Sequence, residues 1–289
     1  MRFFVQIWRL LTQAASFPLM VAREGVILVN NKLNSGLRKR IVDMVREGRD
    51  GHIPSAFSIL DILVVLYKDF LKYDPVNPQW AQRDYFILSK GHGCLALYMV
   101  LREHGFLTDE DIKLFCKQGG ILGEHPDCTK VPGAEASTGS LGHGLPFAVG
   151  IALGLQIKGM HNKVYVLVGD GECHEGTIWE AANVANSLQL GNLCVIVDWN
   201  GSAAQLMTRD DLPAKWNAFG WETSVVNGHS ESNIKAAFSS VKSCLHGSPV
   251  VIIAETTKGK GVPMLEGHGI WHHRIPNDEE YKIIMEALS

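Results

Sequence analysis

Three apolar runs rich in valine and isoleucine stand out along the chain. They occupy residues 163–170, 192–199 and 249–256. An uninterrupted run of this length is typical of a strand that is covered on both faces. A shorter run at 84–89 predicts a further strand. Residues 176–191, between the first two long runs, predict a helix that ends at Gly191.

Other segments have helical spacing. Residues 34–48 carry an apolar stripe after an Asn-Ser start, and residues 58–71 are apolar on nearly every side, which predicts a buried helix. A further helix is expected after the 84–89 strand, ending near Glu103. Strand, helix and strand in succession predict an α/β fold with a parallel sheet and helices on both faces.

Composition narrows the class of protein. The 289 residues are 46% hydrophobic, enough for one large domain or two small ones. A formal charge of −3 gives no basic surface for nucleic acid. The six cysteines are scattered with no C-x-x-C pair, which favours reduced thiols in a cytoplasmic protein over a cysteine zinc site or a disulfide framework.

The first thirty residues form a separate, apolar extension. A secretory leader, an upstream extension from a misplaced start and a helix that covers a neighbour all remain open interpretations. Glutamine, threonine and proline interrupt the segment, so it is too short and too broken to span a membrane. No membrane partner is expected.

Polar side chains follow the predicted strands. Asp170 ends the first long strand, Asn200 follows the second, and Lys258 lies just beyond the third. Ligands bind at the carboxyl ends of parallel strands. A carboxylate and an amide oxygen there suit Mg²⁺, and Gly169 and Gly171 let a pyrophosphate approach the backbone. A tight surface turn is the alternative for this G-D-G segment taken alone.

Four histidines lie in glycine-containing or loop-like segments. They are His52 in GHIPS, His92 in SKGHG, His125 in GEHPD and His272 in GIWHH. A single histidine is more often structural, but several in such loops indicate proton transfer or phosphate binding. The segment STGSLGHG at 137–144 adds a small, flexible loop.

Together these motifs resemble the amino-terminal, thiamine diphosphate-binding part of transketolases. GDG…N, GHIPS, SKGHG, GEHPD, TGSLGHG, TTKGKG and WH occur in the family order over residues 34–288. The resemblance implies a thiamine diphosphate-binding domain at 31–289, with 1–30 as the extension. It implies thiamine diphosphate and Mg²⁺, or Ca²⁺ or Mn²⁺ in its place, as cofactors.

The resemblance also assigns residues. The implied metal ligands are Asp170, Asn200 and the carbonyl of Ser202. The implied cofactor contacts are Ser55, His92, Gly139, Ser140, Leu141, Gly171, Asn200, Lys258 and His272. The implied substrate and proton-handling residues are His52, His92, His125 and His272. Glu175 and Glu180 match carboxylates that link two active sites across an interface.

Two positions depart from the family pattern. His143 stands where a glutamine is common, and Ile53 stands where a proline often follows the first histidine. Both leave the cofactor assignment intact, and both bear on the fine substrate contacts.

The resemblance covers only half of a transketolase. In the family a second domain binds the aminopyrimidine and supplies an activating glutamate. The chain is therefore expected to be the amino-terminal subunit of a split transketolase, in a heterotetramer with a carboxy-terminal subunit that carries the pyrimidine-binding domain. The implied reaction transfers a two-carbon ketol unit between sugars or sugar phosphates.

Three alternatives remain open at this point. One is another thiamine-dependent synthase subunit, of the deoxyxylulose-phosphate or dihydroxyacetone type. The second is a non-catalytic, cofactor-binding regulatory subunit. The third is an ordinary Mg²⁺- and phosphate-binding α/β protein.

Overall fold

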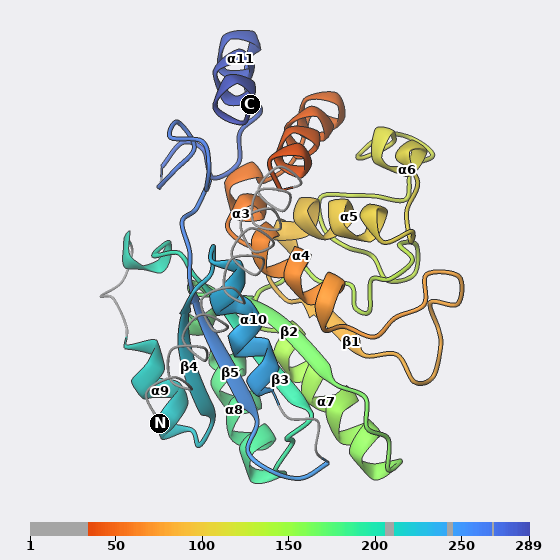
Figure 1. Ribbon diagram of the computed structural model, residues 1–289, viewed down its shortest axis with the longest axis vertical. Helices are drawn as coiled ribbons and strands as arrows, with labels where there is room; N and C mark the ends of the chain where they lie inside the picture. Colours follow the sequence, from red (N-terminus) through yellow and green to blue (C-terminus); the bar gives the residue numbers. More distant parts are fainter. Residues whose placement is uncertain (1–33, 206–210, 242–244, 268) are drawn as a thin grey trace, which may run out of the picture.

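A five-stranded parallel sheet forms the centre of the molecule (Figure 1). The computed structural model describes residues 34–205, 211–241, 245–267 and 269–289, so the extension at 1–30 lies outside the described residues. The strands are β1 (Tyr85–Leu88), β2 (Val164–Gly169), β3 (Leu193–Trp199), β4 (Glu222–Asn227) and β5 (Val250–Glu255). Their order in the sheet is β1-β2-β3-β5-β4. All four strands expected from the apolar runs are confirmed.

Helices cover both faces of the sheet, as the sequence predicts. One face packs against α4 (Leu60–Asp69), α5 (Cys94–Glu103) and α10 (Glu231–Ser240). The other face packs against α7 (Gly144–Ile157), α8 (Gly176–Ser187) and α9 (Leu212–Ala218). Along β2, Tyr165 and Leu167 join the first core while Val164, Val166 and Val168 join the second. The apolar runs are unbroken because alternate side chains of each strand pack into a different core, one on each face of the sheet.

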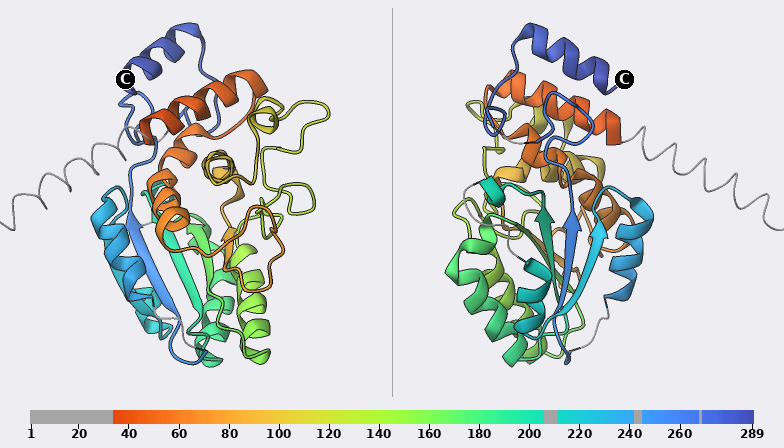
Figure 2. Two further views of the ribbon diagram at one scale, coloured as in Figure 1. Left: turned by 45° about the vertical axis from the view of Figure 1, so that its right-hand side comes forward. Right: turned by 90° about the vertical axis from the view of Figure 1, so that its left-hand side faces the viewer.

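A third group of helices lies over the carboxyl ends of the strands. Helix 34–48, α3 (Ile53–Phe57) and α11 (Asp278–Ala287) stand beyond the arrowheads in the right-hand view of Figure 2. The short helices are α6 (Asp109–Lys113), η1 (Gly91–Gly93), η2 (Glu172–His174) and η3 (Ala203–Gln205). Because η1, η2 and η3 follow β1, β2 and β3 in the chain, the carboxyl ends of these strands carry the connecting loops.

One predicted boundary is wrong. Helix α8 ends at Ser187 rather than at Gly191. The chain turns earlier because Gln189 takes a positive φ of 52°, a left-handed conformation that the helix cannot continue through. Among the described residues, no helix is long and apolar enough to cross a membrane.

Candidate active site

The ends of β2 and β3 lie side by side. Gly169 is in register with Asp198, and the backbone N–H of Asp170 donates to the carbonyl of Asp198 at 3.1 Å. Asn200 follows directly after the last residue of β3. The parallel register therefore brings the Asp170 and Asn200 segments to one edge, as expected.

Asp170 has an oxygen without a partner. Its side chain is buried, and Oδ1 accepts the backbone N–H of Gly171 at 2.7 Å. Oδ2 is buried and has no hydrogen-bond partner among the described residues. Burial raises the pKa of this carboxyl group, and the charge of Asp198 raises it further. Since buried carboxylates in proteins are paired or coordinate metals, this oxygen indicates a cation site.

Asn200 and Ser202 supply further oxygens beside it. Oδ1 of Asn200 accepts the backbone N–H of Ser202 at 3.0 Å and its Oγ–H at 2.5 Å. The amide nitrogen of Asn200 donates to Asp198 at 2.9 Å, which turns the amide oxygen away from that carboxylate. A carboxylate, an amide oxygen and nearby carbonyls are the hard ligands that Mg²⁺ prefers. The residues present therefore fit a magnesium ion.

The backbone next to these oxygens is uncovered at Gly171. A side chain built at Gly171 would meet no heavy atom within 4 Å, so the backbone there is open to a ligand. A small pocket lies beside Asp170, and its other lining residues are His174, Trp199, Gly201, Ala203, Ala204 and Leu212. An uncovered glycine backbone beside oxygen ligands is a place that a phosphate group can approach closely.

Lys258 connects the oxygen site to the histidines. Its Nζ donates to Nδ1 of His272 at 2.9 Å and to Oγ of Ser202 at 3.3 Å. The side chain is buried, and burial together with Lys90 lowers the pKa of its ammonium group. A cation in this position can bind an anionic ligand such as a phosphate.

The structure brings the four predicted histidines together. The ring of His52 lies 5.4 Å from that of His92 and 5.3 Å from that of His272, measured between centroids. His125 lies close enough for its charge to lower the pKa of His52. Residues separated by more than 200 positions thus form one cluster over the carboxyl ends of the strands.

Burial keeps two of these imidazoles uncharged. It lowers the pKa of His52 to about 4, with smaller effects from His273 and His272. It lowers the pKa of His92 to about 2, helped by the charge of Lys90. At neutral pH both rings are therefore neutral, and each offers one N–H donor and one acceptor nitrogen.

The loop at 137–144 is held close to the cluster. Gly139 has a φ of 155°, and a Cβ there would come within 3.0 Å of the His125 ring. Leu141 is half-buried and Ser140 is exposed. These three predicted cofactor contacts therefore lie on one loop beside His125.

Glu172, for which the sequence suggests no role, holds this loop. Its buried carboxylate accepts the backbone N–H of Gly142 at 2.9 Å, that of Gly169 at 3.1 Å and the hydroxyl of Ser89. Burial raises the pKa of the Glu172 carboxyl group. One side chain thus ties the end of β2 to the 137–144 loop.

A buried ion pair supports the floor of the site. Nζ of Lys90 lies 2.5 Å from Oδ2 of Asp198 and also donates to the carbonyl of Ser55 at 3.2 Å. Ser58 and Thr256 donate to the same carboxylate. A single charged residue inside an apolar run, as in VIVDWN, is the sequence signal that could have identified Asp198 as a buried, paired carboxylate.

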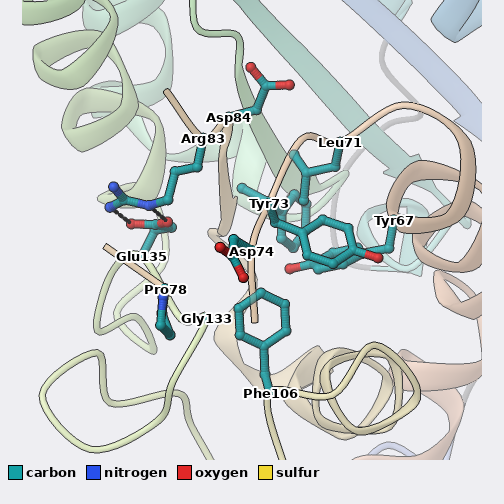
Figure 3. A pocket seen from close by; sticks show the side chains of 11 residues that line it. Tyr67, Leu71, Tyr73, Asp74, Pro78, Arg83, Asp84, Phe106, Gly133 and Glu135 are labelled. Carbon is teal, nitrogen blue, oxygen red and sulfur yellow. Dashed lines mark hydrogen bonds and ion pairs between the residues drawn. The ribbon is translucent and has the colours of Figure 1, made fainter. Parts of the chain in front are cut away.

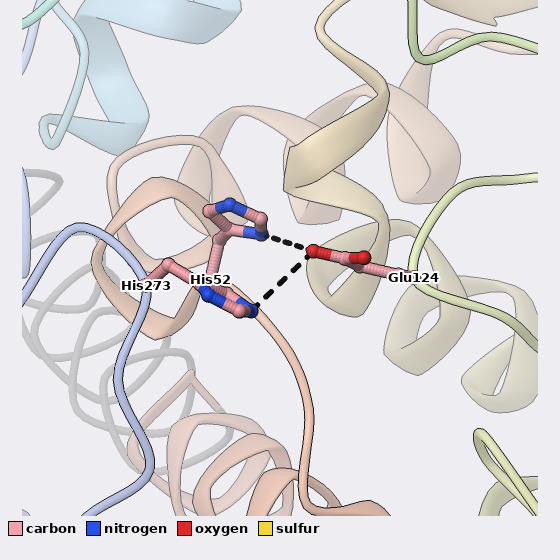
Figure 4. A group of neighbouring side chains, drawn as sticks. All are labelled: His52, Glu124 and His273. Carbon is pink, nitrogen blue, oxygen red and sulfur yellow. Dashed lines mark ion pairs between the residues drawn. The ribbon is translucent and has the colours of Figure 1, made fainter.

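Two further residues lie at the cluster without having been predicted. Glu124, next to His125, and His273, next to His272, both face His52 (Figure 4). The predicted interface carboxylates are Glu175, directly before α8, and Glu180, within α8, and both are exposed. Their role stays a prediction.

A separate pocket lies at the start of β1, and the contacts around it serve the fold. Its wall includes Tyr67, Tyr73 and Phe106 (Figure 3). Arg83 pairs there with Glu135 through two contacts of 2.7 and 2.8 Å, which ties the 126–136 segment to the start of β1. None of the predicted site residues lines it.

Comparison with known proteins gives concordant matches. Residues 29–288 match the family model described as the thiamine diphosphate binding domain of transketolase. The chain is 39% identical over 257 residues to one of the subunits of the apulose-4-phosphate transketolase of Phocaeicola vulgatus, covering 87% of this chain and 91% of that relative. It is 35% identical over 257 residues to the 6-deoxy-6-sulfo-D-fructose transketolase subunit SqwG of a Clostridium species, covering 87% and 93% respectively.

A solved structure agrees with these matches. The transketolase of Campylobacter jejuni superposes with a TM-score of 0.83 at 32% identity, covering 89% of this chain and 42% of that one. The chain thus spans nearly the whole of the two subunit relatives but about two fifths of this solved transketolase.

Proposed function

Since this chain belongs to the transketolase family, we propose that it is the thiamine diphosphate-binding subunit of a two-chain transketolase. The enzyme would transfer a two-carbon ketol unit from a ketose or its phosphate to an aldose or its phosphate. The observation that carries the proposal is the buried, unpartnered oxygen of Asp170 beside Asn200 and Ser202. It supports a metal-bound diphosphate at the carboxyl ends of β2 and β3.

The chain's own residues divide into three roles. Asp170, the amide oxygen of Asn200 and the carbonyl of Ser202 would hold Mg²⁺, and Lys258 would bind the diphosphate. When bound, thiamine diphosphate supplies an electron sink for the cleavage of a carbon–carbon bond. The neutral imidazoles of His52 and His92 would hold sugar hydroxyls, because each can donate and accept one hydrogen bond at neutral pH.

A partner chain is part of the proposal. Two relatives that this chain spans almost completely are named as subunits, and the solved transketolase is more than twice as long. We place the partner on the outer surface of α7 and α8, which carries exposed apolar side chains at Phe147 and Val184. The exposed Glu180 lies on the same helix as Val184, and the exposed Glu175 directly precedes that helix.

The proposal extends to the assembly and the pathway. We propose a heterotetramer of two such chains and two pyrimidine-domain chains, acting on sugar phosphates in carbohydrate metabolism of the pentose phosphate type. One subunit relative is named for apulose-4-phosphate, which supports a phosphorylated substrate, and the other is named for a sulfonated fructose. A cytoplasmic location is proposed from the scattered cysteines.

The test compares Asp170→Asn with the wild type in a mixture with a pyrimidine-domain chain. Calorimetric titration with thiamine diphosphate in Mg²⁺ should show a loss of affinity of about 100-fold or more, because substitutions merely adjacent to metal ligands already cost about 10–100-fold. The isolated chain should show little ketol transfer, and the mixture should restore it. Asp278→Ala, at an exposed carboxylate on α11, is the control and should bind normally.

Stability separates a functional role of Asp170 from a structural one. Because burial and Asp198 both disfavour the charged carboxylate, Asp170→Asn should unfold at the same or a higher urea concentration than the wild type. Unchanged cofactor affinity in this variant would contradict the metal assignment. Lower affinity accompanied by lower stability would assign Asp170 to the fold instead.

A further inference from the structure

Three side chains near the histidine cluster are spaced like the ligands of a metal ion. Oε1 of Glu124 lies 3.5 Å from Nδ1 of His52 and 3.4 Å from Nε2 of His273 (Figure 4). One ligand atom from each of the three residues lies within 4.8 Å of the other two. They come from the turn before α3, from the segment between α6 and α7 and from the loop before α11.

The two distances fit coordination better than direct hydrogen bonding. An N–H···O hydrogen bond spans about 2.7–3.2 Å. Two ligands of a tetrahedral ion, each about 2.0–2.1 Å from the metal, lie about 3.3 Å apart. The distances from Oε1 of Glu124 to the nitrogens of His52 and His273 are therefore close to the distance between two ligand atoms of one tetrahedral ion.

His52 also has an unexplained nitrogen. Nδ1 is buried, and it has no hydrogen-bond partner among the described residues although it points at Glu124. A buried polar atom left without a partner is unfavourable, so such an atom usually has an explanation. A metal ion between His52 and Glu124 would satisfy this nitrogen.

A second carboxylate lies within reach. Oδ1 of Asp50 is 2.8 Å from Nε2 of His273 and also accepts the backbone N–H of Gly51. The side chain of His273 is 51% exposed, those of Asp50 and Glu124 about one third. Solvent therefore reaches the group, and two carboxylates can neutralise a divalent cation that replaces the proton on His273.

We propose that His52, Glu124 and His273 bind a divalent transition-metal ion of the Zn²⁺ class at the entrance to the histidine cluster. Two imidazoles and a carboxylate favour Zn²⁺ over Mg²⁺, which takes oxygen ligands, so this site is distinct from that at Asp170. The ion occupies Nδ1 of His52 and so inhibits ketol transfer. The binding stands alone, and only the inhibition rests on the proposed function.

The binding experiment uses Co²⁺ as a coloured substitute for Zn²⁺. The full chain, in excess Mg²⁺, should take up one equivalent of Co²⁺ with the intense visible absorption of a tetrahedral complex, and Zn²⁺ should displace it. His273→Ala and Glu124→Gln should each weaken Zn²⁺ binding at least tenfold. His246→Ala, at an exposed histidine hydrogen-bonded to Gln156, should bind as the wild type does.

Two results would overturn the binding site. The first is a wild-type chain that takes up no stoichiometric Co²⁺ under these conditions. The second is uptake that persists in both His273→Ala and Glu124→Gln. Circular dichroism of each variant shows whether a loss of binding reflects unfolding, and two independent variants on different segments make that outcome recognisable.

The inhibition experiment uses the assembled two-chain enzyme. Zn²⁺ should lower ketol transfer by the wild type, whereas Glu124→Gln should keep its own metal-free rate when Zn²⁺ is added. Full turnover by wild-type enzyme with the ion bound would refute the inhibition. Absence of ketol transfer with intact Co²⁺ uptake would count against the proposed function alone, and transfer without Co²⁺ uptake would count against the zinc site alone.

Discussion

Replacing Lys90 by methionine tests the buried ion pair below the active site. Lys90 and Asp198 are 2% and 0% exposed and lie 2.5 Å apart. Methionine keeps most of the apolar stem of lysine but removes the charge. The carboxylate of Asp198 then remains buried with neutral donors from Ser58, Thr256 and Asn200.

The expected loss is large because a charge is left without its counterion. Removing one partner of a buried pair costs about 3–5 kcal/mol. Three neutral donors still reach Asp198, so we expect a loss near the lower end, about 3 kcal/mol in the free energy of unfolding. Removing both charges with Lys90→Met and Asp198→Asn together should recover part of this loss, since no uncompensated charge remains.

Urea denaturation followed by circular dichroism measures all four proteins of this double-mutant cycle. Lys113→Met is the control, because it breaks an exposed pair in which Lys113 lies 3.6 Å from Glu110. Exposed pairs contribute less than about 1 kcal/mol, so this variant should stay near the wild type. A Lys90→Met variant within about 1 kcal/mol of the wild type, or strictly additive losses in the double variant, would refute the reasoning.

The remaining predictions concern acid stability and the loop at 137–144. Because burial lowers the pKa of His92 to about 2, the unfolded chain binds more protons than the folded chain below about pH 6.5, so stability falls as the pH falls. Between pH 7 and 5, His92 should account for about 2 kcal/mol, and denaturant titrations of His92→Asn should show a free energy of unfolding that falls correspondingly less with falling pH. An equal pH dependence in His92→Asn and the wild type would contradict this. Glu172→Gln should cost about 2 kcal/mol, because an amide cannot reproduce all three bonds that the carboxylate accepts. Hydrogen exchange at Gly142 should accelerate, and unchanged protection would count against that role.

Most of the sheet could be predicted because its central strands lie between two apolar cores. The runs that became β2, β3 and β5 are uninterrupted for that reason. Strand β4 was not predicted, since it lies at the edge of the sheet with most of its residues exposed or half-buried. Helix α7 gave no clear stripe either, because apolar residues occur all around it and several, such as Phe147, are exposed.

The site could be predicted only in part. Asp170, Asn200 and Lys258 follow strands that are parallel, so their proximity follows from topology alone. The histidines are different, since His52 and His272 are far apart in the sequence and no periodicity places their rings 5.3 Å apart. For them the family resemblance carried the prediction, and the structure supplies the proximity.

The charged residues that support the site could not be assigned from the sequence, because their role depends on where each side chain points in the fold. Lys90 lies in SKGHG among residues suited to phosphate binding, yet its ammonium group points to Asp198. Glu172 follows Asp170 by two positions, yet its carboxylate is fully used by Ser89, Gly142 and Gly169. Of these two neighbouring carboxylates, only Asp170 keeps a buried oxygen that has no hydrogen-bond partner in the part of the chain that the structure describes. In this loop the carboxylate of Glu172 therefore stabilises the fold, whereas that of Asp170 is available to a cation.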